Sequence, residues 1–209
     1  MPDDWLPNPP DGTPVCAGFD GSESQDWTAI KLVTRSGLLF TPRYGPDGSP
    51  TIWDPAMHGG EIPRDLVSVA WSDINRRYRV KRAYCDPPGW RTEIAAWAQE
   101  YGEDVFLEWP TYKAVRMHPA LSTFLTDLKT GELTHDGCPI TTAHIANARK
   151  KAQPGDRYIL AKPAGELHRK IDAAVASVIA VEAAGDAHRA GWEVTTSKLT
   201  RVRGRTSTS

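Results

Sequence analysis

The order of its apolar segments constrains the fold of this chain more than any other feature. Near the start, three strand-like runs follow one another at residues 15–20, 27–34 and 38–42, separated by short polar turns. Farther along, strand-like and helix-like segments alternate. A meander followed by strand–helix–strand units implies a mixed β-sheet with helices on both faces. The sequence therefore predicts an α/β fold.

The remaining elements are expected where apolar residues recur at helical or strand spacing. Helices are expected at residues 63–78, 90–101, 111–129, 141–151 and 168–187, and strands at 79–85, 105–109 and 158–161. Residues 43–61, rich in Gly, Pro and Asp, are typical of a surface excursion. We expect residues 1–13 to form a flexible arm or linker, 14–190 the folded domain, and 191–209 a partly disordered tail.

Composition excludes several classes of protein. With 209 residues and a formal net charge of −1, the chain fits one sizeable domain without a global positive field. Its three cysteines are scattered without metal-ligand spacing, which argues for a reducing compartment. The first residues lack the pattern of a signal peptide, and no apolar run approaches the ~20 residues of a membrane helix. We therefore expect an intracellular protein without membrane contact.

Three isolated carboxylates stand where apolar segments meet a turn or a helix start. Asp20 ends the first strand in V-C-A-G-F-D-G-S, Asp86 follows a later strand in R-A-Y-C-D-P-P, and Asp172 opens the last helix in R-K-I-D-A-A-V. Loops at the carboxyl ends of strands are where α/β sheets build ligand sites. Oxygen-only ligation of this kind suits hard divalent cations, which serve in phosphodiester chemistry.

Each carboxylate also has a purely structural interpretation. Asp20 precedes a glycine and fits turn chemistry, and Asp86 could cap the helix that follows Pro-Pro. Asp172 could simply meet the helix dipole. However, Val175 and Ile179 place Asp172 on the apolar stripe of its helix, where a residue serving only the dipole would be unusual.

The chain resembles the nuclease domain of the large terminase subunits of tailed bacteriophages, which have an RNase H-like fold. The matching pieces occur in family order: G-F-D-G-S-E-S-Q-D-W-T-A, Y-C-D-P-P-G-W, E-W-P, L-T-H-D-G-C-P-I-T-T-A-H-I-A-N-A, K-P and H-R-K-I-D-A-A-V-A-S-V-I-A. The resemblance covers about residues 15–184, so residues 14–190 are expected to be an RNase H-like nuclease domain. No G-x-x-x-x-G-K-[ST] phosphate loop occurs in the sequence, which suggests the nuclease half without the ATPase motor.

The resemblance implies a metal-dependent endonuclease that cuts concatemeric double-stranded DNA during genome packaging. Asp20, Asp86 and Asp172 would be both catalytic and metal-binding, and two divalent ions, Mg²⁺ or Mn²⁺, would be the cofactors. Asp20 would bridge the two ions. The expected partners are double-stranded DNA, the ATPase motor domain, the small terminase subunit and the portal, and the expected location is the cytoplasm of the bacterial host.

Other residues are weaker candidates. Accessory roles as a further acid, a proton shuttle or a phosphate contact are considered for Asp26, His135, Asp136, Lys162 and His168, and for the loop acids Glu23 and Glu166. Basic groups that could follow a DNA backbone are Arg77, Arg79, Lys81 and Arg82 upstream of Asp86, Lys150 and Lys151, and Arg201, Arg203 and Arg205. A solvated charged edge explains any one of these basic groups equally well.

Two alternatives remain open at the level of sequence. The chain could be another RNase H-like nuclease, such as a Holliday-junction resolvase or a transposase core, acting on branched DNA or specific ends. It could also be a non-catalytic DNA-binding or structural module whose acids only cap helices and turns. The H-D-G and E-W-P pieces favour the terminase.

Overall fold

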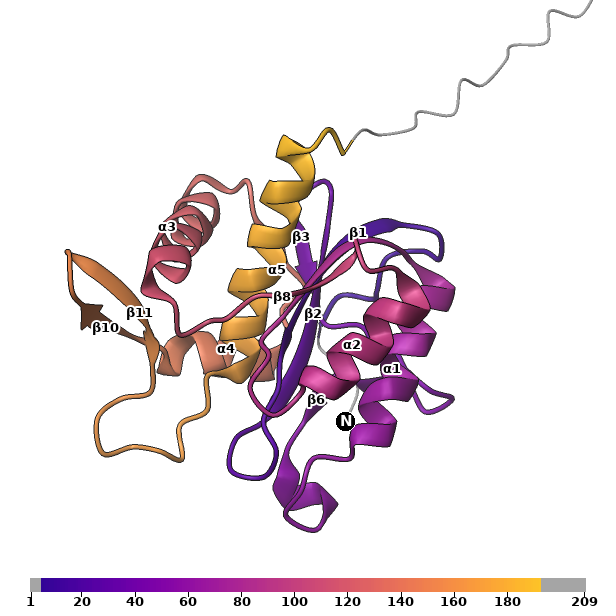
Figure 1. Ribbon diagram of the computed structural model, residues 1–209, viewed down its shortest axis with the longest axis horizontal. Helices are drawn as coiled ribbons and strands as arrows, with labels where there is room; N and C mark the ends of the chain where they lie inside the picture. Colours follow the sequence, from indigo (N-terminus) through magenta and orange to yellow (C-terminus); the bar gives the residue numbers. More distant parts are fainter. Residues whose placement is uncertain (1–4, 193–209) are drawn as a thin grey trace, which may run out of the picture.

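A mixed β-sheet forms the centre of the molecule, with helices on both faces (Figure 1). The computed structural model describes residues 5–192. The strands of the sheet run in the order β8-β7-β1-β2-β3-β9, and β6 also pairs with β2. Their bounds are β1 Pro14–Asp20, β2 Thr28–Thr34, β3 Leu38–Phe40, β6 Ile52–Trp53, β7 Arg79–Cys85, β8 Phe106–Glu108 and β9 Thr134–His135. The predicted fold class is confirmed.

The strand directions follow from the connections. β1, β2 and β3 form the expected antiparallel meander, while β7 lies parallel to β1 and β8 lies parallel to β7. Outside the sheet, two small hairpins pair β4 with β5 and β10 with β11. Their bounds are β4 Arg43–Tyr44, β5 Ser49–Pro50, β10 Arg149–Gln153 and β11 Arg157–Ala161.

The helices divide between the two faces of the sheet. α1 and α2 cover one face, and α5 lies along the other, with α3 beside it (Figure 1). Their bounds are α1 Arg64–Arg77, α2 Arg91–Tyr101, α3 Ala114–Thr130, α4 Pro139–Asn147 and α5 Asp172–Arg189, with a 3₁₀ turn, η1, at Pro55–His58. None of the helices among residues 5–192 is long and apolar enough to cross a membrane.

The alternation of β1 was predicted correctly. Val15, Ala17 and Phe19 belong to the core beneath α1 and α2, whereas Cys16 belongs to the core beneath α5. A strand buried on both faces needs apolar or small side chains on each, and β1 supplies them up to Asp20, its last residue.

Three segments differ most from the prediction. The helix expected at 141–151 ends at Asn147, and residues 149–153 form β10 instead. The last carbonyl groups of a helix have no partner within it, whereas the backbone of β10 is hydrogen-bonded to β11. The last helix begins at Asp172 and not at residue 168. The excursion expected at 43–61 contains β4, β5, β6 and η1, and its strand β6 pairs antiparallel with the start of β2.

The described part of the N-terminal segment, residues 5–13, lies against the domain. The Leu6 amide donates to the Asp136 carbonyl over 2.7 Å, and the Gly12 amide donates to the Arg77 carbonyl over 2.6 Å. The Asn8 side chain joins the same region by donating to the Thr41 carbonyl. The expected C-terminal tail lies, from residue 193 on, outside the described residues.

Candidate active site

Asp20 and Asp86 lie at the same edge of the sheet. Asp20 is the last residue of β1, Asp86 directly follows β7, and these two strands are parallel neighbours. The Asp86 amide donates to the Phe19 carbonyl over 2.9 Å, so the backbone of Asp86 adjoins that of Asp20 directly. The parallel pairing therefore joins two carboxylates that are 66 positions apart in the chain.

α5 brings the third carboxylate to this edge. Gly18 permits the approach, since a Cβ at this position would lie 2.1 Å from the Ala176 carbonyl oxygen and 2.5 Å from the Ala180 nitrogen. Two residues beyond Gly18 the strand reaches Asp20, and one helical turn before Ala176 the helix begins with Asp172. Direct contact of the two backbones thus sets the end of β1 beside the start of α5.

The three carboxylates influence one another electrostatically. Burial, followed by repulsion from Asp172 and Asp86, raises the pKa of Asp20 well above its ordinary value. Burial and then the charge of Asp26 raise the pKa of Asp172 to about 6. Burial also raises the pKa of Asp86. Without a compensating cation, this edge of the sheet does not favour full ionisation of its acids.

Two of these acids differ in the partners of their oxygens. Asp86 accepts a hydrogen bond from the Thr111 amide at one oxygen and from the Thr111 hydroxyl at the other, both over 2.9 Å. Asp172 is 6% exposed, and its Oδ2 has no hydrogen-bond partner among residues 5–192. Thr111 was not among the candidates expected from the sequence, although it lies just after E-W-P, close to the end of the next strand, β8.

A fourth acid, Asp26, lies near Asp20 and Asp172, because its charge raises the pKa of both. Its carboxylate forms ion pairs with Lys162 and, over 2.9 Å, with Lys170. Burial acts to raise the pKa of Asp26, but the two ammonium groups outweigh it and hold that pKa below its ordinary value. Lys170, two positions before Asp172, was not among the sequence candidates.

The chemical type of these ligands suits a hard divalent cation. All are carboxylate oxygens, and one of them, Oδ2 of Asp172, is buried without a hydrogen-bond partner among residues 5–192. The acids are not arranged as a finished ligand cage: within residues 5–192, no three His, Cys, Asp or Glu side chains form a group that could hold a metal ion as they stand. Asp86 is engaged by Thr111, and Asp26 by two lysines. A cation at this edge would therefore require some of these carboxylates to move closer together.

The H-D-G turn does not join the acid cluster through any hydrogen bond. Asp136 is buried and accepts from the Thr41 amide over 2.6 Å and from the Cys138 amide over 3.0 Å, so both of its oxygens hold the turn together. His135 is exposed and accepts from the Gly137 amide. His168 is exposed in the loop before α5, and Glu166 in the same loop pairs with Arg169.

The basic candidates fall into two places. Arg77 ends α1 and Arg79 begins β7, at the opposite end of that strand from Asp86, and both bind the N-terminal segment through Asp11 and the Gly12 carbonyl. Lys81 is exposed and Arg82 half-buried within the same strand. Lys150 and Lys151 lie on β10, paired with the strand that leads into Lys162. Lys162 in turn pairs with Asp26, so this second group lies on a hairpin that leads to the acid cluster. Arg201, Arg203 and Arg205 lie outside the described residues.

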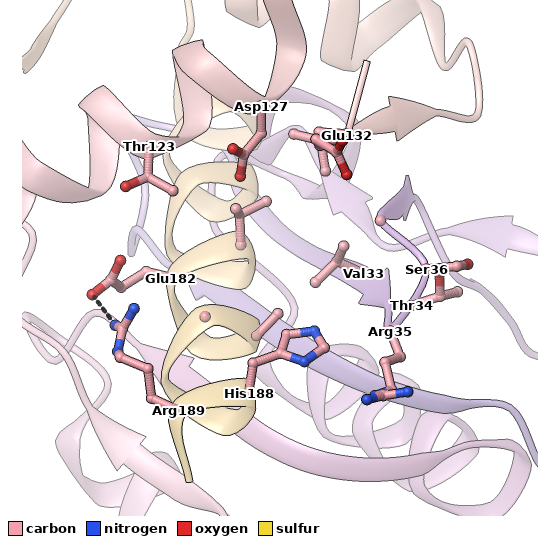
Figure 2. Close-up of a pocket in the computed structure, with 15 residues that line it drawn as sticks. Val33, Thr34, Arg35, Ser36, Thr123, Asp127, Glu132, Glu182, His188 and Arg189 are labelled. Atoms are coloured by element: carbon pink, nitrogen blue, oxygen red, sulfur yellow. Dashed lines mark hydrogen bonds and ion pairs between the residues drawn. The ribbon is translucent and has the colours of Figure 1, made fainter. Parts of the chain in front are cut away.

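A cavity of about 340 Å³ lies at the far end of α5, between that helix, α3 and the β2–β3 turn. Figure 2 shows Asp127 and Glu132 on one side of it and Glu182, ion-paired with Arg189, on another. Burial, followed by the charge of Glu132, raises the pKa of Asp127. None of the site residues expected from the sequence lines this cavity, so it is separate from the acid cluster.

Comparison with curated proteins finds two phage relatives. The chain is 31% identical over 185 residues to the Gene 13 protein of Mycobacterium phage D29 and 30% identical to that of Mycobacterium phage L5. Each match takes in 84% of this chain and 30% of the relative, so the chain spans about 30% of the length of these proteins. No model of a known protein family matches the chain.

Solved structures show the same fold at low identity. The large terminase nuclease from thermophilic phage G20c, solved with bound magnesium, matches with a TM-score of 0.58 and 13% identity over 86% of this chain and 82% of its own. The HK97 bacteriophage large terminase matches with a TM-score of 0.58 and 17% identity over 84% of this chain and 40% of its own. The chain therefore has the RNase H-like fold of phage large terminase nuclease domains.

Proposed function

We propose that this chain is the nuclease domain of a viral genome-packaging terminase and cuts concatemeric double-stranded DNA by metal-dependent hydrolysis. One observation carries the proposal: three separate elements deliver Asp20, Asp86 and Asp172 to one edge of a sheet that has the fold of terminase nucleases. The mutual effects on their pKa values support a shared cation site.

Asp20, Asp86 and Asp172 are the proposed ligands of two divalent ions, Mg²⁺ or Mn²⁺. The G20c nuclease has been solved both with bound magnesium and with bound cobalt, which supports divalent cations as a class. The chemistry that such ions supply is a lowered pKa for the attacking water and compensation of charge at the leaving oxygen.

The other residues of the site have supporting roles in this proposal. Thr111 fixes the orientation of the Asp86 carboxylate with two hydrogen bonds. Lys162 and Lys170 neutralise Asp26 and add positive charge where a DNA phosphate would approach. Lys150 and Lys151 extend that positive charge along β10, which makes the hairpin a proposed contact with the DNA backbone. The ATPase motor domain, the small terminase subunit and the portal are the proposed protein partners, in the host cytoplasm.

A metal-titrated plasmid assay tests the proposal. The wild-type chain should nick and then linearise supercoiled plasmid when Mn²⁺ or Mg²⁺ is added, and EDTA should stop the reaction. Asp20→Ala and Asp172→Ala should remain folded by circular dichroism and show no cutting. Full activity in both variants would refute the assignment of the site, and no metal-dependent nicking by the wild type would favour a non-catalytic module.

A parallel assay separates the terminase from the other RNase H-like nucleases. Linear duplex and a four-way junction are offered at equal concentration to the same preparation. A terminase nuclease cuts the linear duplex with little sequence preference. Selective cutting of the junction identifies a resolvase instead.

A further inference from the structure

The helix α4 holds the chain on both sides of Asp172. On one side, the Asn147 side-chain amide donates to the Lys170 carbonyl over 3.0 Å. On the other, Nδ1 of His144 accepts from the Ala173 amide over 3.0 Å. These two bonds bracket the four residues from 170 to 173, with the carboxylate of Asp172 between them.

His144 acts as the missing cap of α5. The first amides of a helix have no partner within the helix, and the side chain of the preceding residue usually supplies one. Here that residue is Ile171, which has no polar atom in its side chain and makes no such bond. An imidazole from another helix accepts the Ala173 amide in its place.

His144 is suited to this role because it stays neutral. It is 3% exposed, and the ring of Trp27 packs against it edge to face with centroids 5.1 Å apart. Burial, followed by the charges of Lys170 and Lys162, lowers the pKa of His144 to about 4. An unprotonated Nδ1 is required to accept the amide.

α4 is itself fixed to the sheet. Lys31, fully buried in β2, donates from Nζ to the Thr141 hydroxyl over 3.0 Å and to the Thr41 hydroxyl over 2.5 Å. Thr141 lies one turn before His144 on the same helix. A chain of hydrogen bonds therefore runs from the central sheet through α4 to the backbone on either side of Asp172.

We propose that His144 and Asn147 are positioning residues, which hold the Asp172 carboxylate in place for cation binding. The inference rests on the proposed function. Asp172 is buried beside Asp20 and Asp26, whose negative charges repel it, and its Oδ2 has no protein partner. Such repulsion can be relieved by a shift of the backbone that carries the carboxylate, and the two bonds from α4 oppose that shift. Outer partners of metal ligands commonly act in this way.

Mn²⁺ affinity measured by calorimetry on the full chain tests the proposal. His144→Ala and Asn147→Ala should each weaken Mn²⁺ binding by about 10- to 100-fold, the range seen when outer partners of metal ligands are lost. His144→Asn, which keeps an acceptor oxygen near the position of Nδ1, should bind close to the wild type. Ile145→Ala, an exposed position on the same helix, is the matched control and should leave the affinity unchanged.

A double variant separates positioning from general stability. In an Asp172→Asn background, adding His144→Ala should change Mn²⁺ affinity no further, because the residue through which His144 acts has been removed. Wild-type affinity in both His144→Ala and Asn147→Ala overturns the proposal. An equal loss of Mn²⁺ affinity in Ile145→Ala also overturns it. So does a His144→Ala variant that weakens Mn²⁺ binding as much in the Asp172→Asn background as in the wild type.

Amide hydrogen exchange gives a readout that needs no metal. In His144→Ala, the Ala173 amide should exchange faster than in the wild type, while the amides of β1 keep their protection. Unchanged exchange at Ala173 shows that His144 does not hold this amide and overturns the proposal. A wild-type chain that neither binds Mn²⁺ nor cuts DNA contradicts the proposed function alone, and the exchange experiment then still decides whether α4 holds the start of α5.

Discussion

The two faces of the central sheet are packed in different ways on either side of β1. On the side of α1 and α2, large rings fill the space, with Phe19, Trp71, Trp90 and Trp97 in mutual contact at centroid distances of 5.1 to 6.4 Å. On the other side, α5 contributes several buried alanines, among them Ala173, Ala176, Ala180, Ala183 and Ala187.

This difference distinguishes residues that bury apolar area from residues that set the distance between a helix and the sheet. Rings bury large apolar areas but hold helices away from the strands, whereas small residues let backbones touch. At Gly18 the backbone of α5 contacts β1 directly, which is how a carboxylate at the start of a helix reaches the end of a strand. We infer that the aromatic face contributes most to stability and that the alanine face positions the candidate site.

The most damaging change should be a side chain at Gly18. Gly18→Val places atoms where the Ala176 carbonyl stands, so α5 must shift away from β1. We expect a loss of about 5 kcal/mol or more, or no soluble protein, measured by urea denaturation. Gly185→Ala is the matched control, since its Cβ would meet only the flexible Arg189 side chain at 3.4 Å. A Gly18→Val protein with wild-type stability contradicts the close packing of α5.

Truncation on the aromatic face should cost stability without moving the site. Trp71 is fully buried, so Trp71→Ala should reduce the free energy of unfolding by about 3–5 kcal/mol. At a temperature where the variant stays folded, its Mn²⁺-dependent cutting rate should match that of the wild type. Loss of cutting by the folded variant would show that the two faces are not independent.

The acid edge should make metal-free stability depend on pH. The pKa of Asp172 is raised from 3.8 to about 6, so the folded state holds a proton that the unfolded state has released, and unfolding free energy falls as pH rises through this window. Asp172→Asn lacks this penalty. In EDTA it should be more stable than wild type by about 1–3 kcal/mol above pH 6, with the difference vanishing near pH 3.8. Parallel pH profiles of unfolding for the two proteins would contradict the raised pKa.

The smallest expected effect concerns DNA binding by two groups of basic residues. The double variant with Lys150→Ala and Lys151→Ala should have a shallower slope of log affinity against log salt concentration, by about the contribution of two phosphate contacts. The reason is that this hairpin leads into the site. Arg77→Ala with Arg79→Ala should leave that dependence unchanged, because both side chains bind the N-terminal segment. Fluorescence anisotropy at several salt concentrations measures both. The reverse result would place the DNA path at the start of β7.

Most of the fold follows from local pattern. The two-residue alternation of β1 and the apolar spacing of α1 are visible in the sequence, because each depends on neighbours within a few positions. The location of Asp20, Asp86 and Asp172 at segment ends was visible for the same reason. The strand at β10 was missed, since its backbone partners come from β11 and not from its own residues.

The sequence by itself determined most of the strands and helices of the domain, and that three carboxylates stand at the ends of such segments. Only the tertiary structure decided how the acids of the site are held: Asp86 by Thr111, Asp26 by Lys170, and the backbone around Asp172 by His144 and Asn147. The reason is that these partners lie 23 to 144 positions apart, and no local pattern encodes such contacts.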